Sequence, residues 1–228
     1  MLEKLPVIVG HALVKQRAGM ENIVTNELFR ARQTQRIELR SRAFTFNARL
    51  PVRFTADGDG ISPPLEWDAV PEGAASLVLL VEDADSPTPH PLVHAIVVDL
   101  AGAAGSMEEG ALDSADHSGS GLATGQNSFL QKAWLPPDPP RGHGEHRYVF
   151  QVFALGAGAP FSAGPGRREL IAAVLERAVG VGCLIGTYDR AERVSTDVTD
   201  VESVAPATAT ATAMVGLAVP DCAQPAGT

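Results

Sequence analysis

The sequence predicts a fold dominated by β-strands, with helices only at its periphery. Three apolar runs, at 77–81, 93–100 and 148–155, have the length and composition of buried strands. Residues 85–91, between the first two runs, contain three prolines, which rule out a helix and break any β-ladder there. The chain therefore turns back at this point, and the first two runs are expected to pair antiparallel.

Helical patterns flank these strands. Near the N-terminus, apolar residues spaced as on a helix face predict one or two helices through about residue 29: Leu5, Ile8, Val9, Leu13, Ile23, Leu28 and Phe29. We expect this segment to dock on its own sheet or on a second copy of the chain, and not on a membrane, because it has few basic residues.

A second helix is predicted near residues 170–178, where Leu170, Val174 and Ala178 recur on one face. Gly180 and Gly182 are expected to end it before a strand over 183–188. These elements divide the chain into an N-terminal helical extension (1–40), a strand-rich domain (41–192) and an Ala/Thr/Pro-rich tail (193–228) that we expect to be disordered.

Composition bounds the function. A chain of 228 residues, 45% of them hydrophobic, can bury one substantial core. The net charge of −9 and the pI near 5.1 argue against nucleic-acid partners and nonspecific docking on anionic membranes. Only two cysteines occur, which favours a reducing compartment, and no run has the features of a signal peptide or the length of a membrane span. We expect a cytoplasmic protein.

Ionisable residues cluster at the strand ends. Asp83 and Asp85 follow the first run, His94 begins the second, and His146 and Arg147 precede the third. If the third run also pairs antiparallel to the first, all of them lie at one end of one sheet. Each histidine alone could be an ordinary core residue bonded to the backbone, and each aspartate could be part of an ordinary turn. Their gathering at one end of the sheet favours a ligand site.

Period-two alternation predicts which side chains share a face. It places His94 with Ile96 and Val98, and His146 with Tyr148 and Phe150. Each histidine is thus expected to lie in a mostly apolar row.

These residues also carry a family resemblance. The stretches Asp-Ala-Asp-Ser-Pro (83–87) and His-Ala-Ile-Val-Val-Asp (94–99) resemble one signature of the phosphatidylethanolamine-binding proteins (PEBP). Residues 139–150, which include Pro139, His146 and Tyr148, resemble the second signature. Ser-Pro-Pro-Leu-Glu-Trp (62–67) is similar to a stretch of the bacterial and archaeal branch, often labelled Raf kinase inhibitor-like.

The resemblance implies a β-sandwich of two antiparallel sheets with peripheral helices and a pocket for phosphate-like anions or phospholipid head groups at one end. The residues it implies for the pocket are Asp83, Asp85, Pro87, His94, Pro139, His146 and Tyr148. Because carboxylates repel an anion, the aspartates are expected to orient the histidines and keep them protonated, or to bind an ammonium group. Val93, Trp134 and Pro136 depart from the family pattern and bear on head-group specificity.

Three functional classes remain open. The first is a noncatalytic protein that binds a small anionic or phosphorylated ligand, with no cofactor and no resident metal. The second is a hydrolase that uses the His and Asp residues to hold a metal or as acid and base, although the sequence has no Gly-x-Ser-x-Gly, His-Glu-x-x-His or Cys-x-x-Cys motif. The third is a kinase-regulating interaction module, which would rest on family analogy alone. We favour the first.

Overall fold

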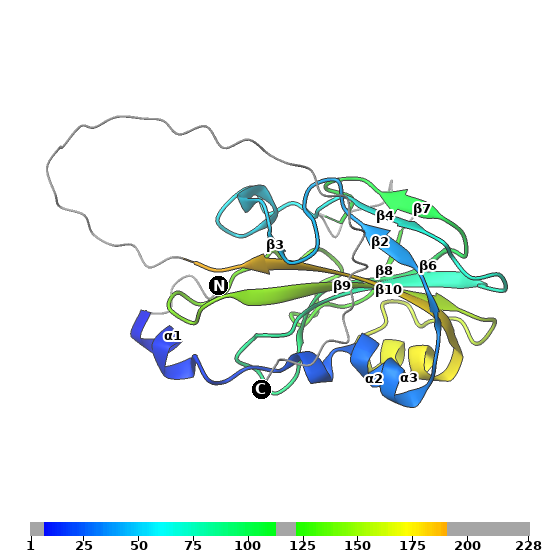
Figure 1. The fold of residues 1–228 in the computed structure, drawn as a ribbon, viewed down its shortest axis with the longest axis horizontal. Coiled ribbons are helices and arrows are strands. Elements are labelled where there is room, and N and C mark those ends of the chain that lie inside the picture. The colour runs from blue at the N-terminus through cyan, green and yellow to red at the C-terminus, as the bar shows by residue number, and fades with distance from the viewer. Residues whose placement is uncertain (1–6, 113–121, 191–228) are drawn as a thin grey trace, which may run out of the picture.

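The computed structural model describes residues 7–112 and 122–190 of the chain (Figure 1). These residues are mostly sheet, with few helices, and all of the predicted strands are present. The helices are α1 (Val7–Leu13), α2 (Val24–Ala31) and α3 (Arg167–Arg177), with short 3-10 turns η2 (Met20–Asn22) and η3 (Val52–Phe54). The strands are β1 (Gln35–Arg36), β2 (Glu38–Arg40), β3 (Ala48–Arg49), β4 (Leu65–Asp68), β5 (Ser76–Asp83), β6 (Leu92–Ala101), β7 (Gly105–Met107), β8 (Ala123–Thr124), β9 (His146–Leu155) and β10 (Ala178–Tyr188).

The strands form two sheets. The larger has the order β1-β10-β9-β5-β6-β8, with β3 also paired to β10, and the smaller is β2-β4-β7. Strands β6 and β9 flank β5 and both run antiparallel to it, as predicted. The expectation of purely antiparallel sheets was wrong, because β1 and β3 pair with β10 in parallel. Each is only two residues long, too short for an apolar pattern to reveal it.

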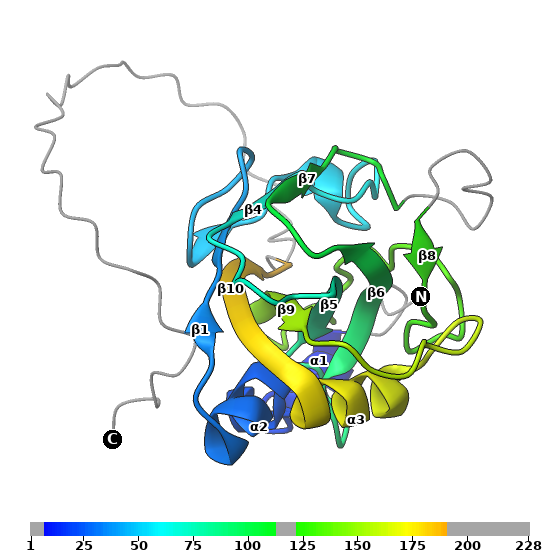
Figure 2. The same ribbon diagram turned by 90° about the vertical axis from the view of Figure 1, so that its right-hand side faces the viewer.

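The chain is layered, as Figure 2 shows: the small sheet lies above the large one and α2 and α3 lie below it. One apolar cluster contains side chains of both sheets, including Trp67, Leu79 and Phe150. A second joins the other face of the large sheet to the helices. The predicted boundary at residue 40 lies at the end of β2, so residues 35–40 already belong to the sheets. The tail predicted to be disordered, 193–228, lies outside the described residues.

A buried carboxylate ties the helices to the sheet. Glu82, fully buried on β5, accepts hydrogen bonds from the Val24 backbone at the start of α2, from Gln151 on β9 and from Arg167 at the start of α3. Burial raises the pKa of Glu82, and Arg167 and Gln151 oppose that rise. The N-terminal segment therefore docks on its own sheet through α2.

Gly180 and Gly182 do not end α3, contrary to the prediction. The helix ends at Arg177, and both glycines lie inside β10, which begins at Ala178. They are needed for close packing: a Cβ on Gly182 would lie 2.7 Å from the carbonyl oxygen of Ile37. A glycine pair after a helical pattern looks like a cap in sequence, but here it marks close approach of backbones.

Substitution of Gly182 by Ala is expected to lower the free energy of unfolding by about 1–3 kcal/mol, because the backbone at Ile37 must move to make room. Chemical denaturation measures the change. The matched control is Gly166→Ala at the start of α3, where an added Cβ meets nothing within 4 Å. Equal effects of the two substitutions would contradict the packing argument.

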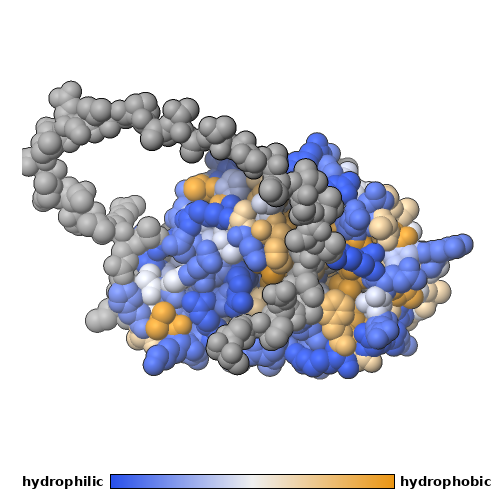
Figure 3. Space-filling model, viewed as in Figure 1, coloured by the Kyte–Doolittle hydropathy of each residue, from blue (hydrophilic) through white to orange (hydrophobic). Residues whose placement is uncertain are grey.

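The face seen in Figure 3 is largely hydrophilic, with scattered apolar side chains. No helix in the described part of the chain is long and apolar enough to cross a membrane. Cys183 lies on β10. The other cysteine, Cys222, lies outside the described residues. The cytoplasmic localisation stays a prediction.

Candidate functional site

A cavity of about 340 Å³ lies where β5 ends and β6 and β9 begin. Its walls come from five parts of the chain: the end of α1, the end of β5 with the following turn, the start of β6, the 129–138 segment and the start of β9. The lining residues are Leu13, Asp83, Ser86, Pro87, Thr88, Leu92, His94, Phe129, Gln131, Leu135, Pro136, Asp138 and His146. The predicted convergence of strand ends therefore produces a hollow.

The structure brings four of the seven predicted site residues to this cavity: Asp83, Pro87, His94 and His146. The other three do not line it. Asp85 turns away to two arginines, and Tyr148 is fully buried beneath the two histidines. Pro139 lies beside the site, where its carbonyl oxygen accepts a bond from Arg190.

His94 does not share a face with Ile96 and Val98, as alternation predicts. Its ring meets Trp134 and Tyr148, in the cluster between the sheets, whereas Ile96 and Val98 lie in the helix-side cluster. The cause is a β-bulge: Val81 pairs with Ala95 and Glu82 with Val93, which leaves His94 as the extra residue. The bulge turns the histidine toward the cavity. For His146 the predicted row with Tyr148 and Phe150 is confirmed.

Only one of the two ring nitrogens of His94 is hydrogen-bonded within the described residues. Its Nδ1 lies 2.6 Å from the carbonyl oxygen of Leu135 and must donate to it, while Nε2 is buried with no partner in residues 7–112 and 122–190. Burial lowers the pKa of His94, and the nearby carboxylate of Asp83 only partly offsets this. At neutral pH the ring is therefore uncharged, with a bare Nε2.

Tyr148 supplies a second unpartnered polar atom. Its ring meets that of His94 edge-on, with centroids 5.1 Å apart, and stacks beside that of His146. The hydroxyl is buried with no hydrogen-bond partner among the described residues. Burial, with the charge of Asp83, raises the pKa of Tyr148 well above 10, so the group stays a hydrogen-bond donor.

Asp83 orients the second histidine. One of its oxygens accepts the backbone N–H of Asp85 at 2.8 Å, and the other lies 2.7 Å from Nδ1 of His146. On the far side of that ring, Nε2 of His146 lies 2.6 Å from Nδ1 of His143. The predicted role of an aspartate as an orienting group thus has a geometric basis at His146.

Asp85 belongs to a buried ion-pair network. Its carboxylate accepts three hydrogen bonds from Arg147, including the backbone N–H, and also pairs with Arg17. Burial alone would raise the pKa of Asp85, but the bonds and charge of Arg147, together with Arg17, lower it. The residue holds the loop between β5 and β6 against β9 and the N-terminal segment.

Asp138 is a cavity carboxylate that the sequence interpretation missed. The buried Arg190 pairs with it and also with Asp57, which in turn accepts the hydroxyl of Tyr188. Its position between two proline pairs, at 136–140, was a usable signal, because rigid turns often present a functional side chain. Leu13 was missed for another reason: it reaches the site from α1, far away in sequence.

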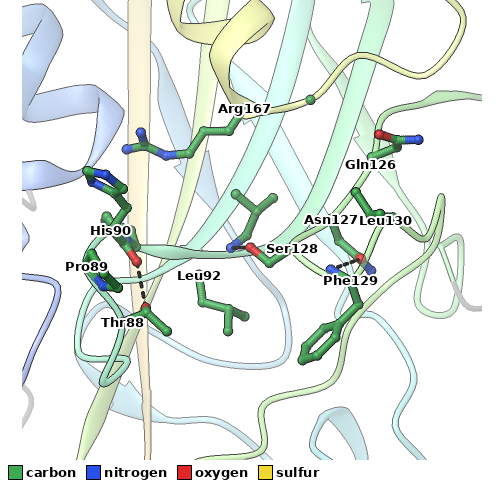
Figure 4. Close-up of a pocket in the computed structure, with 13 residues that line it drawn as sticks. Thr88, Pro89, His90, Leu92, Gln126, Asn127, Ser128, Phe129, Leu130 and Arg167 are labelled. Atoms are coloured by element: carbon green, nitrogen blue, oxygen red, sulfur yellow. Dashed lines mark hydrogen bonds between the residues drawn. The ribbon is translucent and has the colours of Figure 1, made fainter.

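A second hollow, of about 530 Å³, adjoins the cavity and shares Thr88, Leu92 and Phe129 with it. Figure 4 shows Leu92 and Phe129 at one side and Arg167 at the other. The Asn-Ser-Phe stretch at 127–129 forms part of its wall, where the Ser128 hydroxyl accepts the Val93 backbone N–H. The charge of Arg167 is already paired with Glu82 and Glu27.

No group of three or more His, Cys, Asp or Glu side chains within residues 7–112 and 122–190 is arranged to hold a metal ion. Most of the polar loop at 113–126 lies outside the described residues.

The family model for phosphatidylethanolamine-binding protein matches residues 40–189. The chain belongs to the PEBP family. A UPF0098 protein of Methanothermobacter thermautotrophicus is 33% identical over 154 residues, which cover 68% of this chain and 99% of the relative. A UPF0098 protein of Mycobacterium tuberculosis is 37% identical over 153 residues, covering 67% of this chain and 70% of the relative.

Solved structures agree with this assignment. A PEBP homologue of Chlamydia trachomatis is 30% identical and superposes with a TM-score of 0.60, over 69% of this chain and 99% of the homologue. YbcL of E. coli, at 22% identity, has the same fold with a TM-score of 0.63, over 68% of this chain and 98% of that one. The PEBP match begins at residue 40, so α1 and the cavity residue Leu13 lie outside it.

Proposed function

We propose that this PEBP-family protein is a noncatalytic binding protein for a small phosphate-bearing ligand, such as a phosphorylated metabolite or a phospholipid head group. The observation that carries the proposal is the buried Nε2 of His94 in the cavity wall, next to the buried hydroxyl of Tyr148 directly behind it; neither atom has a hydrogen-bond partner among the described residues. A buried polar group without a partner costs about 1–3 kcal/mol, so a site that keeps two of them together is suited to a ligand that satisfies both.

The charges around the cavity are compatible with an anion. Each carboxylate is bonded to a partner that reduces its repulsion of an anion: Asp83 to the imidazole of His146, Asp138 to Arg190, and the nearby Asp85 to Arg147. The hydroxyl of Tyr148 donates at any physiological pH, and His94 becomes a donor once it takes up a proton. The repulsion expected from the aspartates alone is therefore largely cancelled.

Among the described residues that line the cavity, no serine has the adjacent base that would activate it, which is why we favour binding over hydrolysis. Ser86 is the one serine in this lining, and its hydroxyl bonds to the Asp83 carbonyl and to Thr88 at 2.7 Å, not to a histidine. Nucleophilic catalysis by serine requires an adjacent base that removes its proton. His94 and His146 instead have backbone or side-chain partners that fix their orientation.

A thermal-shift titration with inorganic phosphate and with phosphoethanolamine tests the proposal. We expect either ligand to raise the melting temperature of the wild type, because it binds the folded state alone. The His94→Ala variant should lose the shift, whereas His90→Ala, at an exposed histidine outside the cavity, should keep it. An equal shift in wild type and His94→Ala would place binding elsewhere.

Anion affinity is expected to rise as the pH falls. Since burial lowers the pKa of His94 below 6.5, the free protein must take up a proton before Nε2 can donate to an anion. Sulfate is the suitable probe, because its own charge is constant. Its association constant, measured by calorimetry, should fall by up to about tenfold for each pH unit between the pKa of His94 in the free protein and its higher pKa in the complex. A pH-independent affinity would contradict the role of His94.

A further inference from the structure

The segment of residues 7–19, called here the N-terminal strap, is bonded to both sides of the cavity mouth. Toward the loop after β5, the backbone N–H groups of Ala18 and Gly19 donate to the carbonyl oxygens of Ser86 and Ala84 at 2.9 and 2.7 Å. Toward the loop before β9, Arg17 donates to the carbonyl oxygens of His143 and Glu145. The strap therefore spans two loops that the PEBP match contains, although it lies outside that match itself.

The strap also fits closely and contributes to the wall. Gly10 on α1 lies so near the carbonyl of Arg141 that no larger residue fits without a shift. Leu13, at the end of the same helix, lines the cavity, whereas the next residue, Val14, is 42% exposed. The helix thus presents one apolar side chain to the ligand space.

A continuous hydrogen-bond chain joins the strap to Asp83. Nε2 of His143 lies 2.8 Å from the carbonyl oxygen of Leu13 and 3.2 Å from that of Gln16. The chain then runs from Nδ1 of His143 to Nε2 of His146, and from Nδ1 of His146 to Asp83.

The number of protons on this chain follows from its ends. A carbonyl oxygen only accepts, so His143 must donate from Nε2. Three hydrogen bonds need three protons, but two neutral imidazoles and a carboxylate hold only two. The three side chains therefore share one extra proton and are neutral as a group. Burial, together with the neighbouring His146, lowers the pKa of His143, so the ring of His143 is the neutral donor to the strap.

We propose that the N-terminal strap is a closing wall of the ligand cavity, with Leu13 limiting ligand size and His143 coupling closure to anion binding. This rests on the proposed function. A bound anion stabilises the extra proton, the proton keeps all three hydrogen bonds intact, and the bonds hold the strap closed. Anion binding and closure therefore favour one another, and the coupling is reciprocal. The other charged or titratable groups near these three side chains are Arg17, His94 and Asp138.

Cleavage by trypsin after Arg17 reports closure, because the protease acts on a segment that has opened locally. In the full chain, His143→Ala should speed cleavage at this bond at least about tenfold. The substitution removes the hydrogen bonds from the imidazole of His143 to the carbonyl oxygens of Leu13 and Gln16. His143→Gln, whose amide can donate to one group and accept from the other, should retain most of the protection. His90→Ala is the control at an exposed histidine and should cleave at the wild-type rate.

Mass spectrometry follows the bond after Arg17, and circular dichroism confirms that each variant is folded. A folded His143→Ala variant that is cleaved at the wild-type rate would overturn the proposal. If that variant does not fold, the wild type still decides: 10 mM phosphate should slow cleavage after Arg17 in the wild type but not in His94→Ala. Phosphate that binds the wild type by thermal shift yet leaves the cleavage rate unchanged would overturn the coupling.

The size limit has its own comparison. Leu13→Ala should increase the affinity for phosphoserine relative to inorganic phosphate, and the neighbouring Val14→Ala should leave that ratio unchanged. An unchanged ratio of the two affinities in Leu13→Ala would contradict the proposal that Leu13 limits ligand size. If no phosphate compound binds the wild type at all, the proposed function fails, whereas faster cleavage of His143→Ala would still establish the tether.

Discussion

Substitution of Asp85 by Asn is expected to lower the free energy of unfolding by about 3 kcal/mol, because charge-assisted bonds are lost and two arginines face an amide. One carboxylate oxygen accepts two bonds from Arg147, at 2.9 and 2.6 Å, and the other binds Arg147 and Arg17. An Asn amide nitrogen would point a donor at one of these donors. Both arginines are about one-third exposed, so water recovers part of the cost.

Urea denaturation measures this change, and a drop in melting temperature of about 6–12 °C should accompany it. The matched control is Asp59→Asn, at an exposed loop position. The pH dependence provides a second check. Because folding lowers the pKa of Asp85 below 3.8, its stabilisation is complete above that value and is lost as the pH falls through the lower folded pKa. The variant should lose this part of the acid sensitivity; a shift of under 1 kcal/mol would contradict the network.

Substitution of Tyr148 by Phe should change stability and binding in opposite directions. The hydroxyl has no partner in the part of the chain that the structure describes, so its removal should raise the free energy of unfolding by about 1 kcal/mol. The same removal should weaken phosphate binding by about 10- to 100-fold, the worth of a hydrogen bond to a charged group. Denaturation without ligand and calorimetry with phosphate give the two values.

Tyr188→Phe is the matched control, because Tyr188 is equally a buried tyrosine but donates to Asp57 at 2.9 Å. It should lose about 1 kcal/mol of stability and keep its phosphate affinity. If Tyr148→Phe instead behaves like Tyr188→Phe, the Tyr148 hydroxyl has a structural partner and the proposed ligand contact is wrong.

The sequence predicted the frame of the site well, and for a physical reason. Strands β5, β6 and β9 are long and apolar, and the prolines after Asp83 leave only an antiparallel return, so the meeting of Asp83, His94 and His146 followed from local pattern. Family resemblance then implied the pocket. The parallel pairing of the two-residue strands β1 and β3 with β10 was not predictable in the same way.

What the sequence interpretation missed depends on single-residue geometry or on distant contacts. The bulge at His94 inserts one residue into the ladder and reverses its face, and no local pattern marks it. Asp85 and Asp83 look alike in sequence, but Arg147 and Arg17 draw one of them away. The contribution of α1 to the site depends on a contact between Leu13 and His143, which lie 130 positions apart in the chain.

The two adjacent carboxylates of β5 constrain how this protein can evolve. Glu82 serves the helices on one face of the strand and Asp83 serves the cavity on the other. A deletion or insertion of one residue upstream in β5 would exchange the two faces, bury Asp83 beneath α3 and direct Glu82 at His146. Both sides of the sheet would fail at once, so relatives that keep this carboxylate pair should vary in residue identity along β5 but not in its length.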